Sequence, residues 1–181
     1  PDALSKARAY HRIGEVHRLA GRFDLAVEAY RDCYWLADRM GRLDLTSSAL
    51  FGIGMTRLFM GDIRRAARWF RDGQLLLMRH GCHLFQGPSL AGRAACEALE
   101  GDRQAAQATL LDALEQLDGR EDVHRDIGIV CAMAHRAAAS TGITALAEQS
   151  ARLAHRHLRV MDPERTLSGR FGDPDPDLSR Y

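Results

Sequence analysis

Apolar residues recur at helical spacing along most of the chain, and turns that contain glycine interrupt the pattern. Before the first of these turns Tyr10, Ile13 and Gly14 share one face, and after it Phe23 and Tyr30 do the same. Steps of three, four and seven residues are typical of amphipathic helices, and no stretch reads convincingly as a strand. The pattern predicts helices over residues 3–20, 23–40, 43–60, 63–80, 89–100, 103–117, 123–140 and 144–160.

One turn recurs at a near-constant interval. Its glycines are Gly21, Gly61, Gly101 and Gly142, at steps of 40, 40 and 41 residues, and an alanine follows five residues after each. Glycine ends helices well because it adopts the left-handed conformation without a Cβ penalty. A fixed period of this size indicates stacked helix hairpins. We therefore expect one repeat domain over residues 1–160, with repeats at about 3–42, 43–82, 83–120 and 121–160.

The first two repeats resemble the tetratricopeptide repeat. In residues 7–37 the family's spacing is met by Tyr10, Ile13, Gly14, Gly21, Phe23, Ala26 and Tyr30, and residues 47–74 match nearly as well. The later copies depart from the pattern at Arg93, Ala94 and Glu97, and the period exceeds the usual length of about 34 residues. The resemblance implies an all-α fold, a right-handed α-solenoid of about four helix hairpins. Its long period is similar to that of the repeat arms of bacterial transcription regulators.

The resemblance also implies a binding surface, because the first helix of each hairpin lines a concave groove in this family. The residues placed there are Arg8, His11, Glu15, Arg18, Phe51, Met55, Leu58, Phe59, Met133 and Arg136. The four apolar residues between 51 and 59 would form a hydrophobic floor, with charge at its N-terminal end. The alternative is that neighbouring repeats alone bury them. Residues 43–60 are apolar around most of the helix, so this helix must be covered on both sides. Trp35 is expected to anchor the core or a contact between repeats.

Composition and charge limit the class of partner. The chain has 181 residues, of which 46% are hydrophobic and 27% charged, with a formal net charge of +1. This balance does not favour a direct nucleic-acid partner, which usually needs a concentrated basic patch. Basic residues do cluster at Arg64, Arg65, Arg68 and Arg71, and again between residues 152 and 159, either as solvated helix faces or as a partner-binding stripe. No apolar run is long enough to span a membrane.

Candidate chemistry is sparse. Cys33, Cys82, Cys96 and Cys131 have no paired spacing, which favours free thiols in a reducing cytoplasm. The segment from His80 to His83 contains one cysteine and two histidines, too few for a tetrahedral metal site. No catalytic set or phosphate-binding loop is evident, so we expect neither enzyme activity, cofactor nor metal. Residues 161–181, rich in proline, glycine and aspartate, are expected to form an extended or disordered tail.

These patterns favour a non-catalytic, cytoplasmic scaffold that binds a protein or peptide in a concave apolar groove. It could be the sensor or interaction arm of a bacterial regulatory protein. Two alternatives come from other classes. One is a small-molecule-binding domain or enzyme that uses the groove as a hydrophobic pocket, and the other is a homo-oligomerisation module, with a homodimer as its simplest form.

Overall fold

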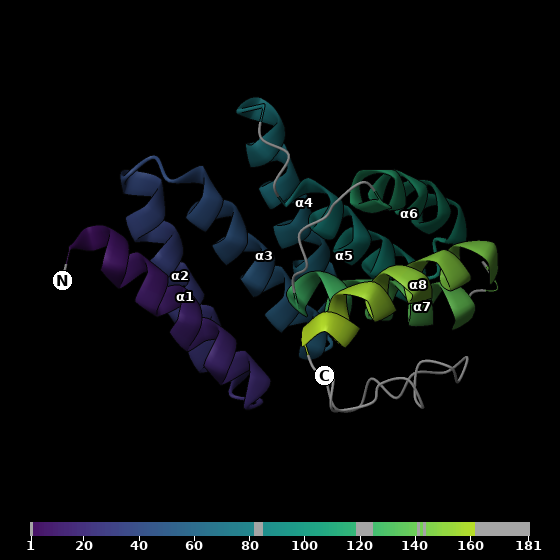
Figure 1. The fold of residues 1–181 in the computed structure, drawn as a ribbon, viewed down its shortest axis with the longest axis horizontal. Coiled ribbons are helices and arrows are strands. Elements are labelled where there is room, and N and C mark those ends of the chain that lie inside the picture. The colour runs from purple at the N-terminus through teal and green to yellow at the C-terminus, as the bar shows by residue number, and fades with distance from the viewer. Residues whose placement is uncertain (1, 82–84, 119–124, 141, 143, 162–181) are drawn as a thin grey trace. The chain divides into compact units, whose positions relative to one another are not determined.

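The computed structural model describes residues 2–81, 85–118, 125–140, 142 and 144–161, and within them the chain is entirely helical (Figure 1). The helices are α1 (Ala3–Leu19), α2 (Phe23–Arg39), α3 (Leu43–Phe59), α4 (Ile63–Arg79), α5 (Gln86–Leu99), α6 (Arg103–Asp118), α7 (Arg125–Ser140) and α8 (Thr144–Met161). The predicted all-α fold is confirmed, and the arrangement agrees with an α-solenoid of helix hairpins. One boundary was wrong. Helix α5 begins at Gln86, so Gly87 is helical although Pro88 follows it. The C-terminal tail lies outside the described residues.

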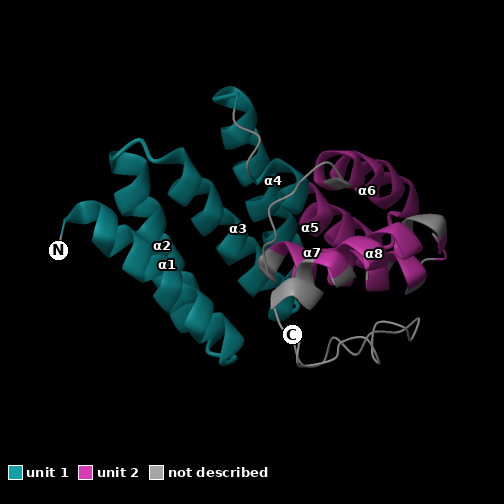
Figure 2. Cartoon of the chain, in the orientation of Figure 1, with its two compact units in different colours: residues 1–89 teal, residues 90–181 magenta. Residues whose placement is uncertain are grey.

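The chain separates into two compact units, residues 1–89 and 90–181 (Figure 2). In the first unit α1 packs on α2 and α3, α2 packs on α3, and α3 packs on α4. In the second, α7 packs on α8, and α6 packs on both. The division falls inside α5, so it follows the packing of the helices and not the repeat interval. A single repeat domain over residues 1–160 stays a prediction.

Glycines end the helices as the sequence predicted. Six of them, Gly21, Gly41, Gly61, Gly81, Gly101 and Gly142, have φ between 60° and 87°. After Gly21 the backbone N–H of Arg22 donates to the carbonyl of His17 at 2.9 Å, and Asp62 donates in the same way to Arg57. These bonds give partners to carbonyl groups that would otherwise accept no hydrogen bond at the end of a helix. Each hairpin therefore reverses within two or three residues.

Close approach of the helices in the first unit depends on glycines facing aromatic rings. The ring of Tyr30 on α2 is fully buried and lies against Gly14 on α1 and Gly52 on α3. A Cβ atom at Gly14 would stand 2.8 Å from this ring, and one at Gly52 would stand 2.5 Å from it. Gly54 on α3 receives Phe70 of α4 in the same way. Tyr30 therefore joins the first hairpin to the second.

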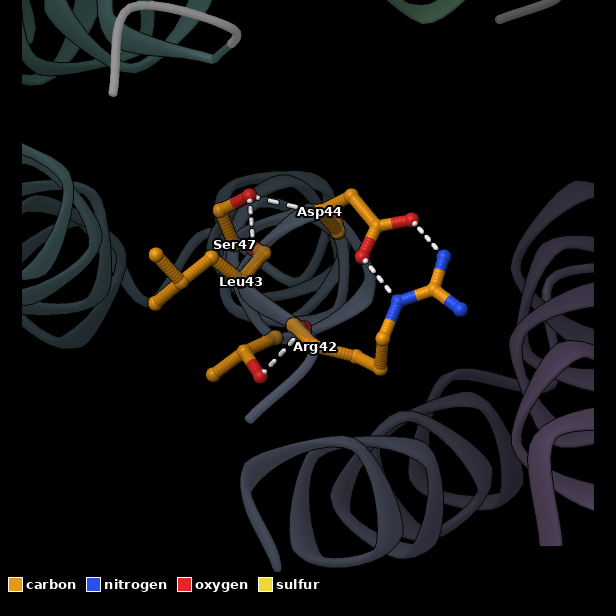
Figure 3. Close-up of polar contacts among 5 residues, drawn as sticks. Arg42, Leu43, Asp44 and Ser47 are labelled. Carbon is orange, nitrogen blue, oxygen red and sulfur yellow. Dashed lines mark hydrogen bonds and ion pairs between the residues drawn. The ribbon is translucent and has the colours of Figure 1, made fainter. Parts of the chain in front are cut away.

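Helix α3 is the centre of the first unit. Eleven of its seventeen residues are buried, in an almost unbroken run from Thr46 to Leu58, which agrees with the expectation that it is covered on both sides. Its start is held by Arg42, whose Nε and Nη2 donate to the two carboxylate oxygens of Asp44 at 3.0 and 2.7 Å (Figure 3). The hydrogen bond from Arg42 lowers the pKa of Asp44. The negative charge of Asp44 near the N-terminus of α3 also interacts favourably with the helix dipole.

Polar contacts replace apolar ones in the second unit, where the repeat pattern departs from the family. Arg93 donates from Nε to Glu97 at 3.0 Å and from Nη2 to the hydroxyl of Thr109 at 2.8 Å. The unexpected charges at residues 93 and 97 thus form an ion pair within α5, and Arg93 also ties α5 to α6 through Thr109. The buried ring of His135 on α7 lies 2.7 Å from the carbonyl oxygen of Ala147 on α8. These bonds hold helices together at positions where packing alone serves in the first unit.

Three apolar side chains lie where the sequence did not predict them. Trp35 is 56% exposed instead of anchoring the core, and the guanidinium of Arg39 stacks over its ring at 4.6 Å. Ile13, which the helical pattern places on one face of α1 with Tyr10 and Gly14, is 43% exposed, and Leu19 at the end of the same helix is 44% exposed. The repeat pattern assigns a face to each residue, but it does not say whether another helix covers that face.

The three described cysteines are free and buried, as expected. Burial raises the pKa of Cys33 to about 11 and the pKa of Cys96 and Cys131 to about 12, from an ordinary value near 9.0. The thiolate form that reacts with disulfide reagents is therefore suppressed at neutral pH.

We expect a Cys82→Ser variant of the full chain to react with a chromogenic disulfide reagent at pH 8 only after unfolding in guanidinium. The substitution removes the cysteine that lies outside the described residues. Because the folded-state pKa values exceed the unfolded value, the stability that these thiols contribute is complete below pH 9 and is lost as pH rises through 11 to 12. Rapid labelling of the native protein would contradict the burial.

Candidate functional site

The predicted site residues of the first helix converge with one residue that the sequence analysis missed. Nε2 of His11 on α1 lies 2.6 Å from the hydroxyl oxygen of Ser48 on α3, so this contact joins the first two hairpins. The edge of the His11 ring also meets the face of Tyr30, with centroids 5.5 Å apart. Ser48 stands forty residues after Arg8, at the same position of the repeat. The signal that could have found it was therefore the period itself.

Glu15 and Arg18 continue the site one and two turns further along α1. Glu15 accepts a hydrogen bond from Arg12 at 2.9 Å, and its carboxylate lies 3.9 Å from Nδ1 of His11. Arg18 is only 4% exposed, and its Nε lies 3.5 Å from the hydroxyl of Tyr30. Its guanidinium also lies over the ring of Phe59 at 5.8 Å. Burial of this charge against an aromatic face and a hydroxyl indicates that Arg18 holds α1, α2 and α3 together.

The predicted apolar floor is buried. Phe51, Met55 and Leu58 are at most 4% exposed, whereas Phe59 is half-buried and stacks on Phe23 at 6.4 Å. Phe51 contacts the rings of Phe70 and Phe85, with centroids 5.8 and 5.7 Å apart. This burial agrees with the alternative in which neighbouring helices cover these side chains. Contact between this trio and a partner stays a prediction.

Three predicted site residues, Arg8, Met133 and Arg136, remain to be placed. Arg8 is exposed on α1, one turn before His11. Met133 and Arg136 belong to the second unit, where Met133 is half-buried and Arg136 is exposed, three residues apart on α7. Within the first unit the structure thus groups His11, Glu15, Arg18 and Phe59 around Ser48 and Tyr30, with Arg8 one turn away along α1.

The chemistry of the cluster favours recognition over catalysis. A serine hydroxyl beside an imidazole is the beginning of a nucleophile and base pair. The 3.9 Å between His11 and Glu15, however, is too long for the hydrogen bond that would orient the base. Ser48 also lies inside α3, where the backbone N–H groups are used within the helix and cannot stabilise an oxyanion. Hydroxyl, imidazole and carboxylate groups in one row suit hydrogen bonding to a peptide.

Metal and membrane sites gain no support from the described part of the chain. No three histidine, cysteine, aspartate or glutamate side chains gather there as a metal site would require. The segment around Cys82 lies outside the described residues. None of the described helices combines the length and the apolar character needed to cross a membrane.

Comparisons with known proteins show what this arrangement of helices resembles. The family model for the tetratricopeptide repeat matches residues 5–73, which span α1, α2, α3 and most of α4. The solved structure of the apo form of RapI superposes with a TM-score of 0.70 over 94% of this chain. Residues 5–73 match the tetratricopeptide repeat, and the chain as a whole has a tetratricopeptide-like helical repeat fold.

The likeness to RapI concerns the fold alone, because only 13% of the residues are identical. This tetratricopeptide-like chain spans 62% of the length of that protein. No curated protein sequence matches it. Repeats of this family in general act as scaffolds for interaction with other proteins, so the match over residues 5–73 supports a protein-interaction role in general.

Proposed function

We propose that this protein is a non-catalytic scaffold that binds a peptide or an extended protein segment along α1 and α3 of the first unit. The observation that carries the proposal is the row of polar side chains formed by Arg8, His11, Glu15 and Ser48. Arg8 is exposed, whereas the side chains of His11 and Glu15 are 14% and 16% exposed. Partial burial on rigid helices limits the conformational entropy that such groups lose on binding.

The row suggests which peptide fits. Arg8 offers a positive charge, Glu15 offers a negative charge, and His11 with Ser48 offers an imidazole and a hydroxyl for hydrogen bonding. We propose that Phe59 contributes the apolar contact and that Phe51, Met55 and Leu58 support the wall from within the fold. Met133 and Arg136 are proposed as contacts of the second unit. The partner is then a mixed-charge segment, in contrast to a purely hydrophobic one.

Selection of peptides from a display library on the immobilised full chain tests this proposal. We expect selected peptides to bind His11→Ala and Arg8→Glu variants at least about tenfold more weakly, because loss of a hydrogen bond to a charged or partly buried group costs about 1.4 kcal/mol or more. Gln107→Ala on the exposed face of α6 is the matched control and should bind as the unmodified chain does. Affinities that are unchanged in both α1 variants, with circular dichroism showing folded protein, would exclude this surface.

We further propose that the scaffold serves a bacterial regulatory protein and acts in the cytoplasm. The basis is composition, since Lys6 is the single lysine among 25 basic residues and the three described cysteines are free thiols. A reducing compartment keeps such thiols free. Fractionation of cells that express the epitope-tagged native protein tests the location, and recovery from the culture medium or the membrane fraction would contradict it.

A further inference from the structure

The outer faces of α2 and α4 carry opposite charges at matching positions. On α2 the exposed residues include Asp24 and Glu28, whereas the residues forty positions later, on α4, are Arg64 and Arg68. Trp35 on α2 corresponds in the same way to Leu75 on α4, and these two side chains are 56% and 44% exposed. Each helix thus presents a charged first half followed by an exposed apolar residue. The first two charges of this face are acidic on α2 and basic on α4, whereas the next, Arg31 on α2 and the equivalent Arg71 on α4, have the same sign.

These charges have almost no partners within the chain. Among the described residues, Asp24, Glu28 and Arg64 form no ion pair, and Arg68 approaches only Asp72, at 3.7 Å. Exposed ion pairs contribute little, so solvation alone is an ordinary state for such side chains. Two pairs of corresponding positions on these helices, Asp24 with Arg64 and Glu28 with Arg68, are nevertheless complementary in charge.

Helices α2 and α4 approach one another in the first unit. Trp69 of α4 packs against a cluster that includes Val27 and Tyr30 of α2 and Ile53 of α3. Because α2 and α3 are antiparallel, as are α3 and α4, helices α2 and α4 run in the same direction. Repeat-equivalent residues such as Asp24 and Arg64 therefore lie at about the same height along the pair.

A twofold axis parallel to the two helices would place α2 of one copy over α4 of the other. Rotation about that axis keeps the helix direction and the height of every residue, so Asp24 would meet Arg64, and Glu28 would meet Arg68, in both halves of the interface. Arg31 would face Arg71 next to these pairs, and this like-charge contact weakens the dimer. Trp35 would meet Leu75 and the exposed Met78 beyond the charged zone. Both copies use the same surface in such an isologous contact. The assembly therefore stops at a dimer, because neither copy has a free α2 and α4 face to bind a third.

We propose that the outer face of α2 and α4 binds a second copy of this chain and forms a symmetric dimer held by reciprocal charge pairing around Trp35. A foreign acidic partner would use only the arginines of α4 and would leave the acids of α2 and Trp35 without a role. The second copy uses all of them. Surface charge pairs contribute little and are screened by salt, so the affinity of the two copies for one another is low. The dimer dissociates as ionic strength rises.

Sedimentation equilibrium of the full chain, at concentrations up to about 0.5 mM in low salt, tests the proposal where a weak complex is still populated. We expect dimers of the unmodified chain and monomers of two variants, Arg64→Glu with Arg68→Glu and Asp24→Arg with Glu28→Arg. Each variant gives both helices the same sign, so its copies repel one another. An equimolar mixture of the two variants should restore a one-to-one dimer, because acidic faces then meet basic faces in both halves of the interface.

The matched control reverses two exposed charges on α6, Asp112→Arg with Glu115→Arg, and should dimerise as the unmodified chain does. All of the substituted residues are exposed, and circular dichroism checks that each variant is folded. A monomeric unmodified chain would overturn the proposal, as would variants that still dimerise or a mixture that stays monomeric. Peptide binding at α1 and α3 is measured separately, so failure of either proposal leaves the other to its own test.

Discussion

A Tyr30→Ala chain is expected to lose about 3–5 kcal/mol of unfolding free energy in the first unit. The ring is fully buried and lies between Gly14 and Gly52, which have no side chain that can move into the space it leaves. The resulting cavity stays empty at the contact between the two hairpins. Since small domains are stable by only about 5–15 kcal/mol, this single change removes a large part of the total. Urea unfolding followed by tryptophan fluorescence measures it, because both tryptophans, Trp35 and Trp69, lie in the first unit.

Tyr30→Phe separates the role of the ring from that of its hydroxyl. Nε of Arg18 lies 3.5 Å from this hydroxyl, at the outer limit of a hydrogen bond, so its loss should cost about 1 kcal/mol or less. A Tyr30→Phe chain as unstable as Tyr30→Ala would mean that the buried arginine, and not the packing of the ring, holds the hairpins together.

Gly52→Ala is expected to destabilise the first unit by about 1–3 kcal/mol, although alanine is the better helix former. The added Cβ atom would stand 2.5 Å from Cε1 of Tyr30, and the ring cannot withdraw because Gly14 of α1 confines its other side. Helices α2 and α3 must therefore separate. The same urea titration measures the loss, which should appear with little change in helical content by circular dichroism.

Gly73→Ala on α4 is the matched control for this prediction. Its Cβ atom would meet Leu50 at 3.5 Å, an ordinary contact, so the change should be neutral or should stabilise the unit by up to about 1 kcal/mol. If the two alanine variants have the same stability, the fit of Tyr30 against Gly52 is not what sets the distance between the hairpins.

Local patterns determined the helices and the turns between them. Glycines at steps of about forty residues end helices because their backbone tolerates positive φ, as Gly21 and Gly61 do. Helical spacing of apolar residues is likewise local, so it placed α1 to α4 within one or two residues. The start of α5 was wrong because Pro88 restrains only its own neighbour, and tertiary packing overrode that preference.

The candidate site was predictable in part. The resemblance pointed to His11, Glu15 and Arg18 on α1, and the structure brings these three together with Phe59. Ser48 was missed because its role appears only once α3 lies beside α1. Contacts across hairpins join residues more than twenty positions apart, and no local pattern encodes which side chains meet there.

By itself the sequence determined the helices, the turns that reverse them and the repeat that stacks them, because each depends on residues close together in the chain. Only the tertiary structure decided which apolar side chains are covered. Phe51 and Met55 are buried whereas Trp35 is exposed, although all three suit an apolar face. Burial depends on whether another helix lies against a side chain, and that is a property of the packed helices, not of their order in the chain.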